Sequence, residues 1–247
     1  MNLVIDFGNT RCKTYLFNDA QIIENNVFLY ESNELITYLL NIVKQPTING
    51  VIISSVTEKF ANIAKKIVDE FNQTIILNPT TPLPIKLCYK QRSQLGNDRI
   101  AAAVGATVMF PNQNVLVIDA GTAITYEYIQ EGTTYLGGNI SPGLSMRFAS
   151  LHEHTSKLPL ITASKPTKTP GQTTNEAMNN GVVQGILAEI SWYIQRFEQS
   201  TRHSAIILTG GDAIFLAEYL KNTIFAVPNL VAIGLNRILQ YNVFKEK

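Results

Sequence analysis

The chain has 247 residues, which is enough for one large domain or two of ordinary size, with a substantial core in either case. Its 20 lysines and arginines against 19 aspartates and glutamates leave a formal charge of +1, without the basic block that binds nucleic acid. Cys12 and Cys88 are far apart and outside any C-x-x-C pattern, so a disulfide framework and a structural zinc site are not indicated.

The first residues lead directly into an apolar strand, without the pattern of a signal peptide. No apolar run approaches the ~20 residues that are needed to span a bilayer. We therefore expect a soluble, cytoplasmic protein with neither membrane nor nucleic acid as a partner, and a reducing compartment fits the two cysteines.

Predicted strands and helices alternate along the chain. Apolar runs rich in β-branched residues predict buried strands, and stretches with helical spacing predict helices between them. Two further stretches predict strand pairs joined by turns at Asn18-Asp19 and Glu131-Gly132. In chain order we expect a strand at 3–5, paired strands at 12–17 and 22–30, a helix at 33–43, a strand at 51–53, a helix at 58–71, a strand at 75–77, a helix at 98–109, a strand at 115–118, paired strands at 124–129 and 134–140, a helix at 175–198, a strand at 206–208, and helices at 213–220 and 230–241.

This order of elements occurs twice. The segments DFGNT, from Asp6, and DAGTA, from Asp119, each follow a strand and head a three-strand meander that helices follow. We interpret the repeat as a duplicated α/β architecture with a cleft between two domains, and the polar break at 111–114 predicts domains at 1–112 and 113–247. The segment 155–174, rich in Pro, Thr and Ser, predicts an irregular loop, with a position over the cleft as a hypothesis.

The DFGNT segment has the features of a phosphate-binding turn. Gly8 permits a tight turn or close backbone approach, and Asn9 and Thr10 supply short hydrogen-bonding groups beside exposed amides. A carboxylate suits such a site when hydrated Mg²⁺ lies between it and the phosphates, which puts Asp6 on the metal side. One D-x-G-x-T segment is explained equally well by an ordinary strand and turn, but two copies in similar meanders favour a nucleotide site.

The two turns resemble the phosphate-1 and phosphate-2 motifs of the acetate-kinase, sugar-kinase, Hsp70 and actin superfamily. The adenosine motif of that superfamily is matched by IILTGGDA, where Gly210 and Gly211 would let adenine or ribose approach the backbone. The resemblance implies two ribonuclease-H-like (actin-like ATPase) domains with mixed sheets facing a central nucleotide cleft. It also implies ATP binding by Asp6, Phe7, Gly8, Asn9, Thr10, Arg11, Cys12, Lys13 and Thr122.

Within the superfamily, the chain resembles the type III pantothenate kinases over nearly all of its length. The residues that carry this resemblance are LGNDR at 95–99, YLGGNISPG at 135–143 and GQTTNEAM at 171–178. The resemblance implies ATP-dependent phosphorylation of pantothenate to 4′-phosphopantothenate, the first step of coenzyme A biosynthesis. It further implies Mg²⁺ with ATP, a monovalent cation (K⁺ or NH₄⁺) and a homodimer.

The G-x-D-R signature of that family is matched here with Asn97 in the variable position, and the resemblance makes Asp98 the catalytic base for the pantothenate hydroxyl. Phosphoryl transfer to an alcohol does need a carboxylate within reach of the hydroxyl proton. From position alone, an aspartate at the start of the helix 98–109 is more often a cap. Arg99 offers a fork of donors to a carboxylate or phosphate, and its alternative is a surface ion pair.

Four further expectations follow from the resemblance. Tyr89 would line the pantothenate pocket, and Thr174 would contact the substrate from the partner subunit; packing and a helix N-cap are their ordinary explanations. Asp119 would hold the monovalent cation, while Thr122 meets ATP. The expected substrate-binding residues are Tyr89, Gly96, Asn97, Asp98, Arg99 and Thr174.

The alternative function is a non-catalytic nucleotide-switch or regulatory protein of the same superfamily. The chain lacks room for a peptide-binding domain or for the subdomains of filament formers. It also shows no helix-turn-helix pattern or basic patch for DNA. These features favour the kinase.

Overall fold

A computed structural model describes residues 1–8, 11–29, 33–55 and 61–243. Contacts divide the chain into two compact units: unit 1 comprises Met1–Pro111, Thr133–Tyr135 and Asn229–Lys247, and unit 2 comprises Asn112–Gly132 and Leu136–Pro228. The chain first leaves unit 1 within the predicted break at 111–114, and its last helix returns to unit 1. Domains with a single boundary at 112 and 113 stay a prediction.

Unit 1 is built on a five-stranded sheet in the order β3-β2-β1-β4-β5. The strands are β1 (Asn2–Phe7), β2 (Arg11–Asn18), β3 (Gln21–Leu29), β4 (Gly50–Ser55) and β5 (Thr74–Ile76). The first three form the predicted antiparallel meander, whereas β4 and β5 continue the sheet in parallel. The turn between β2 and β3 is Asp19-Ala20, one residue later than predicted, because Asn18 still pairs with Gln21.

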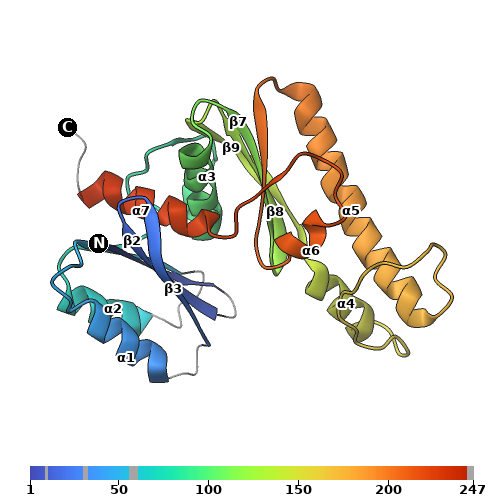
Figure 1. Ribbon diagram of the computed structural model, residues 1–247, viewed down its shortest axis with the longest axis horizontal. Coiled ribbons are helices and arrows are strands. Elements are labelled where there is room, and N and C mark those ends of the chain that lie inside the picture. The colour runs from blue at the N-terminus through green and yellow to red at the C-terminus, as the bar shows by residue number, and fades with distance from the viewer. Residues whose placement is uncertain (9–10, 30–32, 56–60, 244–247) are drawn as a thin grey trace. The chain divides into compact units, whose positions relative to one another are not determined.

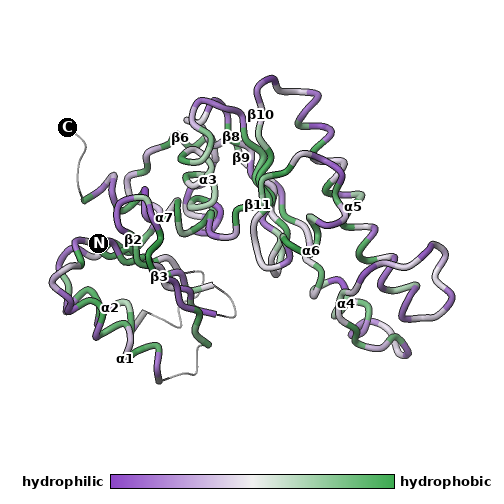
Figure 2. Tube along the Cα trace, viewed as in Figure 1, coloured by the Kyte–Doolittle hydropathy of each residue, from purple (hydrophilic) through white to green (hydrophobic). Residues whose placement is uncertain are grey.

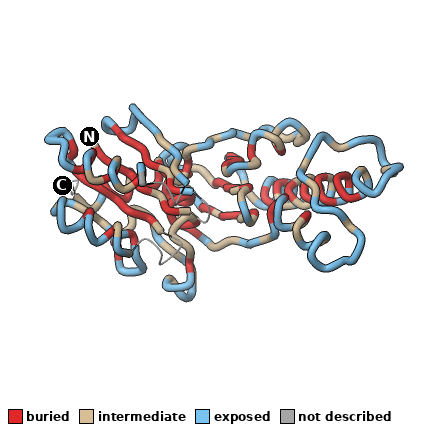
Figure 3. The backbone as a smooth tube through the Cα atoms, turned by 90° about the horizontal axis from the view of Figure 1, so that it is seen from below, coloured by how far each residue is buried: buried red, intermediate tan, exposed pale blue. Residues whose placement is uncertain are grey.

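Helices α1 (Asn33–Ile42) and α2 (Ala61–Glu70) cover one face of this sheet (Figure 1). Alternate residues of β1 point to opposite faces, so Leu3, Ile5 and Phe7 all enter the core beneath these helices. The strands β1 and β4 are buried along almost their whole length, whereas β3 at one edge of the sheet is largely exposed. Figure 3 shows the backbone coloured by this burial. The predicted start of the second helix at 58 lies outside the described residues.

Helices α3 (Asn97–Met109) and α7 (Leu230–Val243) pack against each other, and α7 contacts β1 and β4. The crossing depends on two glycines. A Cβ atom on Gly105 would lie 2.3 Å from the Leu230 carbonyl oxygen, and one on Gly234 would lie 1.8 Å from that of Ala101. This close packing fixes α3, whose first turn carries Asp98.

Two short elements precede α3 and were not predicted. They are the strand β6 (Lys86–Leu87) and a 3-10 helix, η2 (Arg92–Gln94). Neither is long enough to give a hydrophobic period, so the sequence carries no signal for them.

The second sheet repeats the order of the first. The strands β7 (Asn114–Ala120), β8 (Ala123–Gln130), β9 (Thr134–Pro142), β10 (Ser204–Thr209) and β11 (Phe225–Ala226) are arranged as β11-β10-β7-β8-β9, with β6 beyond β9. β8 is antiparallel to β7, and β10 is parallel to it, as β2 and β4 are to β1. The duplicated architecture that the sequence predicts is therefore present.

The long helix α5 (Thr174–Ser200) supplies much of the core of unit 2. Hydrophobic and hydrophilic segments alternate along it (Figure 2), as expected of a helix with one buried side. Its buried residues pack with Leu116 and Ile118 of β7 and with Ile206 and Leu208 of β10. The helix α6 (Ala213–Ala217) is shorter than predicted, because Glu218 and Tyr219 form a turn.

A further helix, α4 (Leu144–Glu153), was not predicted. Its N-cap is Gly143, which has no side chain to give the usual capping signal, and the helix buries only Leu144 and Phe148. Within the described ranges, no helix combines the length and the hydropathy of a membrane span.

Candidate active site

Asp6 lies near the carboxyl end of β1, between Lys13 of β2 and Ser54 of β4. Burial raises the pKa of its carboxyl to about 6; Lys13 opposes this rise, and the charge of Asp98 adds to it. Two carboxylates of unit 1 are thus close enough to repel each other. A bound cation would relieve that repulsion.

Gly8 and Arg11 flank the first D-x-G turn. The Gly8 amide donates to the Arg11 carbonyl oxygen at 3.1 Å. Phe7 and Cys12 face each other in the register and lie in the core, where burial raises the pKa of the Cys12 thiol. Among the expected ATP-binding residues, these two can therefore meet a ligand only through their backbone. Asn9 and Thr10 lie outside the described residues.

Asp98 is the second residue of α3, and Gly96 is the N-cap. The Oδ1 atom of Asp98 accepts a hydrogen bond from the Arg99 amide at 2.9 Å. A Cβ atom on Gly96 would lie 2.5 Å from this Oδ1, so the glycine makes room for the carboxylate. The cap interpretation of Asp98 is wrong as to the N-cap position, although the carboxylate does satisfy one amide of the first turn.

Asn97 has a structural contact that the sequence did not reveal. Its Nδ2 atom donates to the carbonyl oxygens of Leu77, at 3.0 Å, and Ser55, at 3.3 Å. These carbonyls lie where β5 and β4 end. Asn97 thereby ties the start of α3 to the same edge of the sheet that carries Asp6, which explains why Asp98 acts on the pKa of Asp6.

Arg99 is only 6% exposed, so its interpretation as a surface ion pair is wrong. Its Nη2 atom donates to the Tyr135 hydroxyl at 3.0 Å, and its guanidinium carbon lies 5.9 Å from the centre of the Tyr89 ring. The rings of Tyr89 and Tyr135 are 6.2 Å apart. A buried cation is thus held by two aromatic residues. Tyr135 was not predicted as a site residue, although it opens the YLGGNISPG motif.

In unit 2, Asp119 occupies the position that Asp6 has in unit 1. It pairs with Thr125 of the antiparallel neighbour and with Thr209 of the parallel neighbour. The Gly121 amide donates to the Ala123 carbonyl oxygen at 3.0 Å and closes the turn, in which Thr122 is exposed. The two aspartates thus occupy equivalent positions in their sheets.

The glycines of IILTGGDA pack against this second turn. Gly210 has a φ of +96°, and a Cβ atom there would lie 2.3 Å from the Ala120 carbonyl oxygen and 2.5 Å from Asp119 Oδ1. Only glycine combines that backbone conformation with that approach. The predicted adenosine motif therefore lies beside Asp119.

Thr174 is the first residue of α5 and not its N-cap, so that explanation of it is wrong. Thr173 is the N-cap and accepts a hydrogen bond from the Glu176 amide at 3.2 Å, while Glu176 accepts one from the Gln172 amide at 2.7 Å. Thr174 is exposed and lines a groove of about 780 Å³ in unit 2. The other lining residues are Pro142, Met146, Arg147, Ser150, Leu151, Leu158, Ala177, Met178, Gly181 and Val182.

The loop that precedes α5 is fastened to that helix. The Asn179 side chain accepts from the Ser164 amide and donates to the Ser164 carbonyl, both at 3.0 Å. The Asn180 side chain accepts from the Thr167 amide at 2.8 Å. Both asparagines are buried, so the loop has a defined path along α5. Its position over a cleft stays a hypothesis.

The described residues contain no group of three or more His, Cys, Asp or Glu side chains arranged to hold a metal ion. Mg²⁺ bound with a nucleotide does not require such a group. It keeps several waters and uses one or two carboxylates together with phosphate oxygens. The Asp6 carboxylate fits this requirement.

The repeated sheet with its paired D-x-G turns defines a class of protein, the actin-like ATPase fold that sugar kinases share. A Sinorhizobium meliloti protein named as a 2-dehydro-3-deoxygalactonokinase has a TM-score of 0.59 at 12% identity and covers 97% of this chain and 98% of its own. A Cytophaga hutchinsonii protein named as a sugar kinase has a TM-score of 0.54 at 16% identity, over 97% and 99%. A Campylobacter jejuni protein named for the Baf family of transcriptional activators has a TM-score of 0.63 at 25% identity, over 97% and 98%. The predicted α/β fold with two ribonuclease-H-like domains is confirmed.

Sequence relationships define the family within that class. The model of the type III pantothenate kinase family matches residues 2–196. Type III pantothenate kinases of Flavobacterium johnsoniae and Porphyromonas gingivalis are each 40% identical to the chain, with 98% of this chain and 99% of theirs covered. The chain belongs to the type III pantothenate kinase family, as its motifs predicted, and it is an enzyme of the kinase class.

Proposed function

We propose that the chain transfers the γ-phosphoryl group of ATP to the primary hydroxyl of pantothenate. The product, 4′-phosphopantothenate, enters coenzyme A biosynthesis as its first intermediate. The observation that carries the proposal is that Asn97 anchors the start of α3, where Asp98 lies, to the sheet edge that carries Asp6, in a chain of this family. A non-catalytic switch or regulatory role is not favoured. The two relatives described above are named as kinases, and the chain matches them over 99% of their length.

In this proposal Asp98 is the catalytic base and orients the acceptor. The Arg99 amide holds one of its oxygens at 2.9 Å. A carboxylate fixed in this way can accept the proton of a hydroxyl that lies in line with the γ-phosphorus. Gly96 leaves the space in which the carboxylate sits.

The acceptor pocket is proposed to include Tyr89, Gly96, Asn97 and Arg99. Pantothenate carries a carboxylate, and Arg99 is a buried cation whose fork of donors suits such a group. Tyr89 lies against the guanidinium and adds an apolar wall. Asn97 contributes by anchoring the start of α3.

ATP is proposed to bind through the residues of the first turn, 6–13, and through Thr122 of the second. Mg²⁺ would neutralise phosphate charge on the side of Asp6. The nearby glycines Gly210 and Gly211 suit close approach of adenine or ribose to the backbone.

Asp119 is proposed to bind a monovalent cation, K⁺ or NH₄⁺. Carboxylate and backbone carbonyl oxygens are suitable ligands for a hard cation, and the Ala120 carbonyl lies beside the same Gly210 turn as Asp119. The cation would brace the second turn.

A cytoplasmic homodimer completes the proposal. Thr174 would contact pantothenate in the partner subunit, as the family resemblance implies. Two observations support this: Thr174 is exposed, and it borders a groove with Met146, which is 45% exposed. The reducing cytoplasm suits a chain whose cysteines are both free thiols.

The test is an ADP-release assay over a panel of alcohols that includes pantothenate, with ATP and Mg²⁺. We expect turnover with pantothenate and with no other alcohol of the panel. An absence of ADP release above background with pantothenate would overturn the proposed function. ADP release that is independent of every alcohol would favour the nucleotide switch instead.

A further inference from the structure

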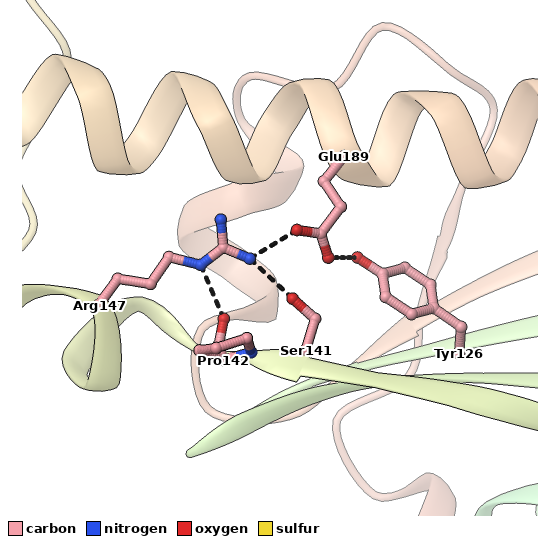
Figure 4. Close-up of polar contacts among 5 residues, drawn as sticks. All are labelled: Tyr126, Ser141, Pro142, Arg147 and Glu189. Carbon is pink, nitrogen blue, oxygen red and sulfur yellow. Dashed lines mark hydrogen bonds and ion pairs between the residues drawn. The ribbon is translucent and has the colours of Figure 1, made fainter. Parts of the chain in front are cut away.

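The junction between β9 and α4 is held by a network of charged and polar side chains that the proposed reaction does not use (Figure 4). Arg147 lies one turn into α4. Its Nε atom donates to the Pro142 carbonyl oxygen at 2.9 Å, and its Nη2 atom donates to the Ser141 hydroxyl at 2.7 Å. The same Nη2 atom forms an ion pair with Glu189 of α5 at 2.6 Å. The Arg147 side chain therefore contacts both residues at the end of β9 and also the neighbouring helix α5.

Glu189 gives this network a rigid support. Its Oε1 atom accepts a hydrogen bond from the Tyr126 hydroxyl at 2.7 Å. Tyr126 is fully buried in β8 and stacks on Tyr193 of α5 with ring centres 3.7 Å apart. Burial acts to raise the pKa of Glu189, but hydrogen bonds from Arg147, Ser141 and Tyr126 outweigh it and hold the pKa below its ordinary value. Glu189 is therefore ionised at neutral pH, and its charge is matched by Arg147.

Gly143 connects this network to the second turn. It follows Ser141 and Pro142 directly, and its amide donates to the Thr122 carbonyl oxygen at 3.1 Å. A Cβ atom on Gly143 would lie 2.2 Å from the Gly121 carbonyl oxygen, so the junction rests on the backbone of the turn at a distance that only glycine allows. A displacement of the junction must therefore displace the turn between β7 and β8.

We propose that Arg147 is a positioning residue for this turn. By fixing Ser141 and Pro142 against Glu189, it holds Gly143 where Gly143 supports the backbone of Gly121 and Thr122. The inference rests on the proposed function only where it names the ligand of the turn, which is the phosphate chain of ATP.

The fork geometry of arginine suits this role. Two of its nitrogens, Nε and Nη2, reach three acceptors on two elements at once. A lysine in its place can pair with Glu189 but cannot reproduce the fork. A partly buried ion pair is also weak support for stability itself, since replacing such a pair by neutral groups is often tolerated. Geometry and stability can therefore be separated by mutation.

The experiment compares three variants with the wild-type full chain in steady-state kinetics and thermal unfolding. Arg147→Met leaves Glu189 without its partner, so we expect a lower melting temperature and a KM for ATP raised about 10-fold or more, with the KM for pantothenate within about 2-fold. Arg147→Met combined with Glu189→Gln keeps an acceptor for Tyr126 and removes the unpaired charge. We expect it to recover most of the melting temperature and to keep the raised KM for ATP.

Arg147→Lys is the conservative variant. It preserves the charge opposite Glu189, so its melting temperature should stay near that of the wild type while the KM for ATP rises about 3-fold to 10-fold. The positioning role is overturned if the double variant recovers the KM for ATP together with its stability, or if Arg147→Lys leaves the KM for ATP unchanged. Lys44→Met is the matched control, because it breaks an exposed ion pair with Glu70 at 3.5 Å in unit 1 and should alter neither quantity.

Hydrogen exchange without nucleotide tests the same inference independently of any activity. The Gly121 amide donates a hydrogen bond within the turn, to Ala123, and the Gly143 amide donates one to the turn, at Thr122. We expect both amides to exchange about 10-fold faster in the double variant than in the wild type. Faster exchange in a protein that does not phosphorylate pantothenate would sink the proposed function and leave the positioning role standing. Unchanged exchange at both amides would sink the positioning role, whatever the kinase assay shows.

Discussion

Burial and the charge of Asp98 on α3 both act to raise the pKa of Asp6 on β1, which is about 6. Burial is the larger of the two causes. These residues are distant in the sequence, and Asn97 brings them to one edge of the sheet by bonding to the carbonyls of Ser55 and Leu77. The proposed base and the proposed metal-side carboxylate are therefore electrostatically coupled. Removing the charge of Asp98 should change the pKa of Asp6.

The first prediction concerns stability and pH at Asp6. A carboxyl whose folded pKa is raised from 3.8 to about 6 destabilises the fold when it ionises, so its cost is absent below pH ~4 and develops as the pH rises through 6. The shift corresponds to at most about 3 kcal/mol. We expect Asp6→Asn, in the absence of divalent cations, to raise the free energy of unfolding by about 1–3 kcal/mol at pH 7 and to have little effect at pH 4. Urea titrations at several pH values would show this, and a difference that does not vary with pH would contradict it.

The second prediction concerns Arg99. Arg99→Lys keeps the charge but loses the fork that meets the Tyr135 hydroxyl and the flat group that lies against Tyr89. We expect the KM for pantothenate to rise about 10-fold, which is about 1.4 kcal/mol, with the KM for ATP nearly constant. Arg196→Lys is the matched control, because Arg196 also lies 5.9 Å from an aromatic ring, that of Trp192 in unit 2. Equal effects of both substitutions on pantothenate would argue against a specific role of Arg99.

The third prediction concerns the packing that holds α3. Gly234→Ala would place a Cβ atom 1.8 Å from the Ala101 carbonyl oxygen, so α7 and α3 must move apart. We expect a loss of about 1–3 kcal/mol in the free energy of unfolding, as for other overpacked cores. Gly185→Ala is the control: it lies within α5, where the added Cβ atom would meet nothing within 4 Å, and it should stabilise the protein by about 0.5–1 kcal/mol. Denaturant unfolding measures both, and a neutral Gly234→Ala would mean that the crossing is not tight.

The fourth prediction concerns Asp119 and the monovalent cation. If Asp119 binds K⁺ or NH₄⁺, turnover in potassium buffer should exceed turnover in sodium buffer several-fold, and Asp119→Asn should abolish the difference. The comparison is made at constant ionic strength, because exposed charges are screened by salt. Equal rates of the wild type in sodium and potassium would remove the claim.

The sequence predicted best those parts of the fold in which a clear hydrophobic period is bounded by a turn that contains glycine. The meanders of β1 to β3 and β7 to β9, with the parallel strands beside them, follow the expected order. The helix α4 was missed because its cap is Gly143, and the reason for that glycine is a contact with Gly121, which is close only in the folded chain. A local pattern cannot report a contact of that kind.

The site shows the same limit. The motif around Gly96 predicted which residues group at the start of α3, but not that Arg99 is buried against Tyr135 or that Asn97 bridges two strands. Both facts depend on pairs of residues that are remote in sequence. The N-cap alternative misses by two positions for Asp98 and by one for Thr174, because Gly96 and Thr173 adopt the cap conformation.

The last prediction separates the catalytic interpretation of Asp98 from a purely structural one. Asp98→Asn keeps an oxygen that can accept the Arg99 amide, so the melting temperature should hardly change. The amide cannot accept the hydroxyl proton, and turnover should fall by roughly 10²–10⁴-fold, the usual contribution of acid–base catalysis. Asp69→Asn, on the exposed face of α2, is the matched control and should be without effect.

The binding of pantothenate to Asp98→Asn shows which step is lost. Phosphoryl transfer depends heavily on orientation and charge neutralisation, so a lower rate alone does not distinguish a base from an orienting ligand. Binding that is nearly unchanged, with turnover collapsed, would assign Asp98 to the chemical step. Weakened binding with turnover retained at saturation would make it a substrate ligand.

The same substitution also removes a negative charge that acts on Asp6. The pKa of Asp6 should therefore move down from about 6 towards its ordinary value. If the pKa of Asp6 does not change, the two carboxylates are not coupled.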